Sequence, residues 1–204
     1  MAINTPRFCK SLATFLFGAL LTNQALAAEP REPVYTGWVW SAHAGTLNID
    51  SDVAKEQYIE DSAWLIGLSA ERYSSDSNFT FLVGVDFIGY SDELPFDQHT
   101  DDGWKESDAS AATAYIEFGP KISFGIDNNN YFVAHAGVSG VLSSERSISY
   151  CRNCYSEDID VSGGFYGVLG VGHSFGSFDI GVQFQQYFSG DIDNSLALRV
   201  SSSF

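Results

Sequence analysis

The chain ends in the stretch Asn194-Ser-Leu-Ala-Leu-Arg-Val-Ser-Ser-Ser-Phe204, and this stretch decides the fold. Its residues alternate in character, with Leu196, Leu198, Val200 and Phe204 on one parity and Arg199, Ser201 and Ser203 on the other. A period of two residues places the two sets on opposite faces of a β-strand. The stretch closes on a large aromatic residue, which indicates a strand whose apolar face meets lipid and not water.

Composition narrows the class of protein. The 204 residues are enough for one domain, and their formal net charge is -16. Such an acidic chain is a poor partner for nucleic acid, whose phosphates are bound by clustered Lys and Arg. The mean hydropathy of -0.04 is too low for a bundle of membrane helices. It does not exclude a membrane barrel, because barrel strands interleave apolar and polar residues.

The N-terminal region has the three parts of a secretory signal peptide. Arg7 and Lys10 precede an apolar run over residues 12–21, and small residues follow at 25–28. The apolar run is about half as long as the roughly twenty residues that a membrane-spanning helix needs. We therefore expect residues 1–27 to be a cleaved signal peptide and residues 28–204 to be the mature, exported domain.

Segments with a period of two recur along the rest of the chain. In one of them Phe79, Phe81 and Val83 alternate with Thr80 and Gly84. Most segments are about ten residues long or slightly longer, the length that crosses a bilayer when a strand is tilted. Counting the last stretch there are eight such segments, at residues 34–44, 63–73, 79–90, 111–124, 131–142, 164–175, 178–188 and 194–204.

The connections between these segments alternate in length. The second, fourth and sixth segments are followed by short turns, and the first, third and fifth by long, mostly acidic loops. Bacterial barrels alternate in this way, with short periplasmic turns and longer extracellular loops. A soluble β-sandwich also has strands with a period of two, but it has no reason to sort its connections by parity. The pattern predicts an all-β, eight-stranded antiparallel up-and-down transmembrane β-barrel.

The last strand resembles the C-terminal signature of bacterial outer-membrane barrel proteins, carried here by Phe204, Val200 and Leu198, with Ser202 as a departure from it. That resemblance implies recognition by the outer-membrane assembly machinery. The whole mature chain looks like the small eight-stranded outer-membrane barrels, the family that includes OmpA's membrane domain, OmpX and the opacity-type porin-like proteins. The resemblance implies export through the signal peptide to the outer membrane of a Gram-negative cell.

Polar residues on the inward parity of the strands are expected to fill the barrel. An eight-stranded barrel has room inside for side chains or for one small ligand. Unpaired charges there would be costly, so we expect salt bridges and hydrogen bonds in which Lys121 and Arg199 meet carboxylates. The alternative is a narrow channel for small or hydrophobic solutes. The expected lumen network comprises Glu71, Asp86, Glu117, Lys121, His135 and Arg199, with Tyr115, Tyr166, Gln183 and Gln185 beside it.

No catalytic, cofactor-binding or metal-binding motif is apparent. Some barrels of this size modify lipid A with a wall Ser or His, and His173-Ser174 is the one pair reminiscent of them. Adjacent strand residues point to opposite faces, so these two do not form a dyad. His43 and His135 have no base or ligand at a recognisable spacing. An enzyme is therefore the less favoured class.

The long loops supply the candidate interaction surfaces. Their many carboxylates suit Ca²⁺ or Mg²⁺, through which the loops could meet lipopolysaccharide. Residues 158–163 begin like a calcium loop, but Leu169 stands where its bidentate Glu belongs. Cys151 and Cys154 are expected to form a disulfide in an oxidising compartment.

Arg and aromatic residues gather near this cysteine pair. Because such side chains anchor interfaces, residues 146–156 are a candidate partner contact, with Arg146, Tyr150, Arg152 and Tyr155 as anchors. The favoured function is a non-enzymatic barrel with a structural, envelope-integrity or surface-interaction role.

Overall fold

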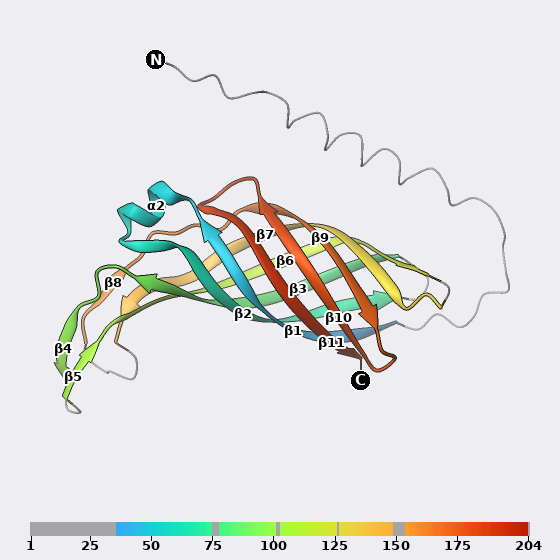
Figure 1. Ribbon diagram of the computed structural model, residues 1–204, viewed down its shortest axis with the longest axis horizontal. Helices are drawn as coiled ribbons and strands as arrows, with labels where there is room; N and C mark the ends of the chain where they lie inside the picture. The colour runs from blue at the N-terminus through green and yellow to red at the C-terminus, as the bar shows by residue number, and fades with distance from the viewer. Residues whose placement is uncertain (1–35, 75–77, 101–102, 126, 149–153, 204) are drawn as a thin grey trace, which may run out of the picture. The chain divides into compact units, whose positions relative to one another are not determined.

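The structure, a computed structural model, describes residues 36–74, 78–100, 103–125, 127–148 and 154–203. The predicted signal peptide lies outside these residues, so its cleavage stays a prediction. One short helix and eleven strands make up the described part (Figure 1). In chain order they are β1 (Thr36–Ile49), α2 (Ser51–Glu56), β2 (Ile59–Ser74), β3 (Phe79–Asp92), β4 (Asp97–Thr100), β5 (Gly103–Glu106), β6 (Asp108–Phe124), β7 (Asn130–Ser147), β8 (Ser156–Asp158), β9 (Phe165–Ser174), β10 (Phe178–Tyr187) and β11 (Ile192–Ser203).

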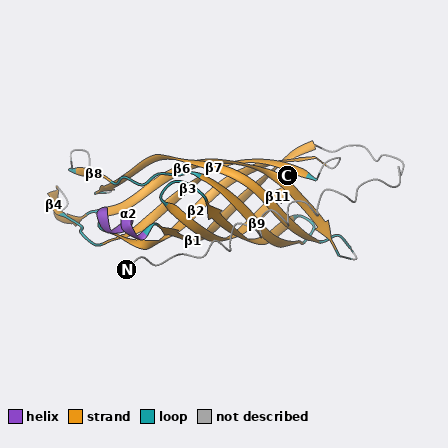
Figure 2. Cartoon of the chain, turned by 90° about the horizontal axis from the view of Figure 1, so that it is seen from above, coloured by secondary structure: helices purple, strands orange, loops and turns teal. Residues whose placement is uncertain are grey.

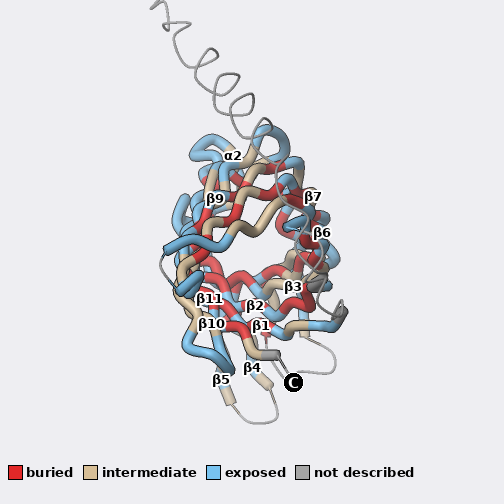
Figure 3. The backbone as a smooth tube through the Cα atoms, turned by 90° about the vertical axis from the view of Figure 1, so that its right-hand side faces the viewer, coloured by how far each residue is buried: buried red, intermediate tan, exposed pale blue. Residues whose placement is uncertain are grey.

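Eight of the strands form a closed antiparallel ring. Each long strand pairs with its neighbours in the chain, and the ring closes where β11 pairs with β1, so that Ser201 lies opposite Ser41 and Arg199 opposite His43. β6 and β7 complete the other side. Viewed along its length, the backbone traces this ring, with buried and exposed positions alternating around it (Figure 3). The predicted eight-stranded barrel is confirmed, because closure leaves no unpaired edge along the wall.

The outer face of the barrel is apolar. Trp40 and Trp64 are more than half exposed, and so are many outward Leu, Ile and Phe side chains. A protein surrounded by water rarely exposes apolar patches of this extent. A transmembrane barrel carries such a belt against lipid. The residues that form the belt have the parity expected from the sequence: Trp38, Trp40, Trp64, Ile66, Leu68, Phe79, Phe81, Phe87, Ile116, Phe118, Leu169, Val171, Val182, Phe184, Leu196, Leu198 and Val200.

Several strands run further at the long-loop end than the sequence predicted. β2 begins at Ile59 instead of residue 63, and β7 continues to Ser147 instead of residue 142. In these extensions the polarity is reversed, so that Ile59 faces inward and Glu60 faces out. The predicted strands ended too early because the apolar parity was assumed to face outward along their whole length. The extensions lie beyond the lipid, where the outward residues are polar and the inward residues apolar.

The long loops carry their own secondary structure. Asp50 caps α2 through its side chain, which accepts hydrogen bonds from the backbone N–H groups of Asp52 and Val53. β4 and β5 form a hairpin, and β8 adds to the end of β7 (Figure 2). At the opposite end a tight turn joins β9 to β10, and its Gly176 adopts a φ of 90°, which favours glycine. Among the described residues no helix is long and apolar enough to cross a membrane.

Candidate functional site in the lumen and at the loop end

A fully buried carboxylate, Glu117 on β6, lies at the centre of the lumen. His135 Nδ1 on β7 lies 3.2 Å from its Oε2, and Tyr166 Oη on β9 donates to its Oε1 at 3.0 Å. Gln185 Nε2 approaches the same Oε1 at 3.4 Å, and Thr80 Oγ1 lies 2.9 Å from His135 Nε2. Three neighbouring side chains thus satisfy a carboxylate that would be costly to bury alone, and Thr80 holds the histidine among them.

A second pair lies on the neighbouring strands. His43 Nε2 on β1 donates to Asp86 Oδ1 on β3 at 2.7 Å. Gly67 on β2 stands between them, and a Cβ there would collide with both side chains. The partners of His43 and His135 were not predictable from the sequence, because their carboxylates lie on other strands and are aligned only by the register of the barrel.

Arg199 does not form the ion pair with a carboxylate that was predicted for it. It is buried opposite His43, but it forms no ion pair within 4.0 Å with any described carboxylate, and its Nε has no hydrogen-bond partner. Two carboxylates of the inner wall are paired with histidines instead, Asp86 with His43 and Glu117 with His135. The expected salt bridge of Arg199 with a carboxylate is therefore absent from the described part of the lumen.

Lys121 occupies the short-turn end of the lumen. Its Nζ lies 3.2 Å from Asp179 Oδ2, 3.9 Å from Glu71 Oε1 and 4.5 Å from the centre of the Tyr131 ring. A cavity of about 290 Å³ at this end is lined by Lys121, Tyr131, Asp179 and Ser201. Because carboxylates flank the ammonium group of Lys121, this end of the lumen is polar and its cation is paired.

The long-loop end of the interior is apolar instead of polar. We call its buried residues the apolar plug: Leu47, Ile49, Ala54, Ile59, Ala63, Leu65, Ile88, Tyr90, Ala109, Ala111, Ile159, Val161 and Ile192. Most come from inward positions of barrel strands, Ala54 comes from α2, and Ile159 and Val161 come from the segment after β8. The plug was not predicted. A signal for it is present in the sequence, since Leu47 and Ile49 continue the parity of the polar face of β1.

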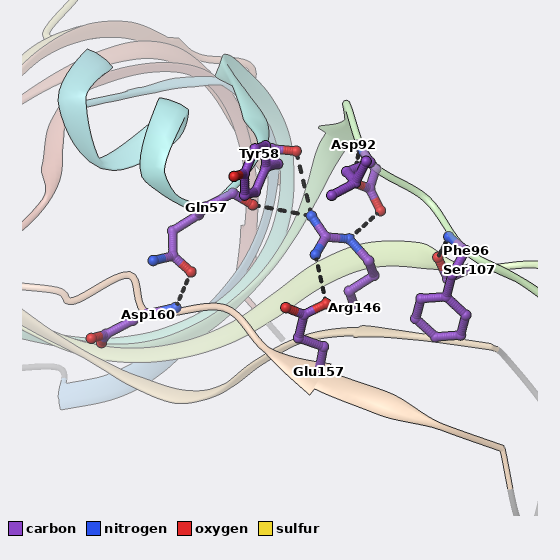
Figure 4. A network of polar contacts seen from close by, with 9 residues as sticks. Gln57, Tyr58, Asp92, Phe96, Ser107, Arg146, Glu157 and Asp160 are labelled. Atoms are coloured by element: carbon purple, nitrogen blue, oxygen red, sulfur yellow. Dashed lines mark hydrogen bonds and ion pairs between the residues drawn. The ribbon is translucent and has the colours of Figure 1, made fainter.

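Arg146 ties the long loops together above the plug (Figure 4). Its Nε donates to Asp92 Oδ2 at 2.6 Å and its Nη1 to Glu157 Oε2 at 3.2 Å. Its Nη2 donates to the backbone oxygens of Gln57 and Tyr58, at 3.0 and 3.4 Å. The hydrogen bond to Asp92 raises the pKa of Arg146 above its ordinary value, so the side chain stays cationic. One buried cation thereby joins the ends of β3, β7 and β8 to the turn after α2.

The predicted partner contact at residues 146–156 is only partly available. Arg146 is 2% exposed, so it is a brace and not an interface anchor. Tyr155 is 62% exposed and remains a candidate. Tyr150 and Arg152 lie outside the described residues. Cys151 does too, so its predicted disulfide with Cys154 stays a prediction.

The predicted assembly signal is described in part. Leu198 and Val200 lie on the outer face of β11, about half exposed, whereas Phe204 is outside the described residues. His173 lies 2.9 Å from Asn130 through Nδ1 and packs against Phe175. No interaction joins His173 to Ser174 in the part of the chain that the structure describes.

The segment that begins like a calcium loop is held by protein groups. The backbone N–H of Asp160 donates to Gln57 Oε1 at 2.9 Å, and Ser162 donates to Asp191 Oδ2 through its N–H and its hydroxyl, at 2.7 and 2.6 Å. Among the described residues no group of three or more His, Cys, Asp or Glu side chains is arranged to hold a metal ion. Any calcium bound here would need carboxylates to rearrange.

The chain has distant structural likenesses among solved proteins. No protein-family model matches the chain, and no curated protein is significantly similar to it. Neisserial surface protein A matches with 13% identity over 85% of this chain and 100% of that one, at a TM-score of 0.45. Ail, the attachment invasion locus protein of Yersinia pestis, solved with the heparin analogue sucrose octasulfate, matches with 11% identity over 82% of this chain and 97% of that one, at a TM-score of 0.49.

Both likenesses are too distant to bear on binding or activity. The closed strand order and the apolar outer face of the chain itself are those of a small eight-stranded antiparallel β-barrel that faces lipid.

Proposed function

We propose that this protein is a non-enzymatic outer-membrane barrel that acts through its long loops, in a surface-interaction or envelope-integrity role. The observation that carries the proposal is the contrast between a filled interior and a braced, acidic loop end. The interior has polar side chains at the level of the lipid and the apolar plug above them. Above the plug, Arg146 joins described residues of three connections, Asp92, Glu157 and Gln57.

The apolar plug argues against a transport role. Its side chains are 9% exposed or less, and they converge from the strands, α2 and the loop after β8. An ion crossing such a region would lose its hydration without gaining polar partners. The cavity near Lys121 lies at the other end of the barrel. It therefore supports a closed pocket at that end and not a channel through the barrel.

The braced loops argue for a binding role. Surfaces that are already ordered lose less entropy when a partner binds. Arg146 orders the connections that follow β1, β3 and β7, and Gln57 and Asp191 hold the segment after β8. The exposed residues of these connections include Glu93, Asp97 and Asp158, so the surface favours cationic partners or divalent ions bridging to lipopolysaccharide.

Conductance of the purified mature protein in planar bilayers tests the closed interior. We expect no single-channel steps over the accessible voltage range. Steps of constant amplitude would contradict the proposal and favour the narrow channel for small solutes.

A loop-shortening variant tests where the activity lies. Residues 94–106 are replaced by a short Gly-Ser turn, and the matched control replaces residues 126–129 at the opposite end. Both variants should show the gel shift on heating that a folded barrel gives. In a deletion strain we expect only the control to restore detergent resistance or surface binding. Equal restoration by both variants would contradict a role for the loops.

A further inference from the structure

The β4–β5 hairpin projects past the ends of the barrel strands, beyond α2 and β8 (Figure 1). It forms a sheet of its own, in which His99 pairs with Trp104 and Asp97 pairs with Glu106. The side chains alternate, so these four residues share the exposed face, while Gln98 and Lys105 lie on the half-buried one.

Trp104 is the most exposed tryptophan of the described chain, at 74%. It does not belong to the lipid-facing belt. Between the hairpin and the belt, the outward positions of β3 and β6 are polar and exposed, with Ser91, Asp108 and Ser110. An aromatic side chain that stands clear of lipid marks a contact site for another molecule.

Two carboxylates flank this aromatic face. Asp97 and Glu106 are directly opposite each other across the hairpin, an arrangement that is unfavourable for like charges. Both are exposed, and neither forms an ion pair with a described residue. A cation placed between them would relieve the repulsion, and the face of Trp104 would add a cation–π contact.

The hairpin is held in place before anything binds. The backbone N–H of Phe96 donates to Ser107 Oγ, and that of Ser107 donates to the carbonyl of Phe96, both at 3.0 Å. Tyr155 donates its N–H to Gln98 Oε1 at 3.0 Å and packs edge-on against the Phe96 ring, with centroids 5.2 Å apart. The half-buried face therefore contacts the connection between β7 and β9 through Gln98. On the exposed face the ring of Trp104 contacts the His99 ring edge-on, with centroids 5.6 Å apart.

We propose that the exposed face of the β4–β5 hairpin is a docking surface for a basic peptide segment. An Arg or Lys side chain of the partner stacks on Trp104 and is neutralised by Asp97 and Glu106. Charge complementarity favours this occupant, since a protein with a net charge of -16 attracts cationic chains from a distance. This inference rests on the proposed surface role and names the chemistry of its partner.

The test measures fluorescence anisotropy of a dye-labelled hexa-arginine peptide with the full mature barrel in non-ionic detergent. The variants are Trp104→Ala and Asp97→Asn/Glu106→Gln. The matched control, Glu60→Gln/Asp61→Asn, removes the same two charges from exposed positions elsewhere at the loop end. All four proteins are first checked for the folded-barrel gel shift.

We expect each hairpin variant to weaken peptide binding about fivefold or more, and the control less than about twofold. Binding should weaken as salt is raised, because exposed charges are screened. The proposal is overturned if the peptide does not bind, if Trp104→Ala binds like wild type, or if the control loses as much affinity as the hairpin variants. Stronger binding of heparin than of hexa-arginine also overturns it. The conductance test is independent of all these outcomes, so a failure here leaves the closed-barrel proposal standing.

Discussion

The polarity of the inner and outer walls of the barrel is reversed between its lipid-facing half and its loop end. At the level of the lipid, the inner wall is polar and the outer wall apolar, with Glu117 inside and Phe118 outside. At the loop end, the inner wall is apolar and the outer wall polar, with Ile59 inside and Glu60 outside. The same strands carry both arrangements. The difference teaches that a period of two fixes two faces, while the surrounding medium decides which of them is apolar.

Removing a partner from the polar half should have the largest effect. His135→Leu leaves the buried carboxylate of Glu117 without its histidine partner, and removing one partner of a buried pair typically costs about 3–5 kcal/mol of unfolding free energy. Urea unfolding of the refolded barrel in lipid measures this. His99→Leu, on the exposed hairpin, is the control and should be nearly neutral. A loss under about 1 kcal/mol for His135→Leu would show that the polar half is hydrated and tolerant.

A large-to-small change in the apolar half should come next. Ile59→Ala leaves a cavity in the plug and should cost about 3 kcal/mol. Ile66→Ala on the same strand removes the same atoms from the outer face, where lipid can fill the space. We expect its cost to be less than half as large. Equal costs for the two isoleucines would mean that the loop end is not packed like a protein core.

The brace between the loops should matter locally. Arg146→Met removes four hydrogen bonds and leaves Asp92 without its partner, a cost of about 2 kcal/mol. Limited proteolysis should therefore cut the long loops faster, while the heated gel shift of the barrel stays unchanged. Arg72→Ala is the control, because Arg72 is exposed near the other end. Unchanged proteolysis in Arg146→Met would contradict the bracing role.

Calcium should have the smallest effect. The exposed carboxylates of the loop end repel one another, so millimolar Ca²⁺ should raise the melting temperature of the refolded barrel slightly. Magnesium at the same ionic strength serves as a comparison, and chelation should reverse the effect. An unchanged melting temperature would contradict the proposal that divalent ions bridge the loops to lipopolysaccharide.

The outward faces of the strands were predictable, since Phe79 and Phe81 or Leu196 and Leu198 recur at every second position. The plug was not predicted, because the apolar parity was taken to be the outer one along the whole strand. Arg146 was misassigned as a surface anchor for a different reason. Its burial depends on Asp92, Gln57 and Glu157, which come from three separate connections and meet only in the folded barrel.

The pairing of lumen residues was equally hidden. His43 meets Asp86 and His135 meets Glu117 through the register of the strands, and no local spacing encodes it. The parity of the strands predicted which residues belong to the lumen network, but it could not predict which of them contact one another. Arg199 is the clearest example. Its ion pair with a carboxylate was predicted from charge balance alone, and in the structure its Nε has no hydrogen-bond partner.

The seam between β1 and β11 has a consequence for the order of folding. The hydroxyl of Ser41 bonds that of Ser201, across 160 positions of the chain. A ring of this kind cannot close until its last strand exists, so a chain still being synthesised has two open edges and no finished wall. Contacts this distant in sequence form slowly. The mature domain must therefore be delivered whole and kept from pairing with other chains until its two ends meet.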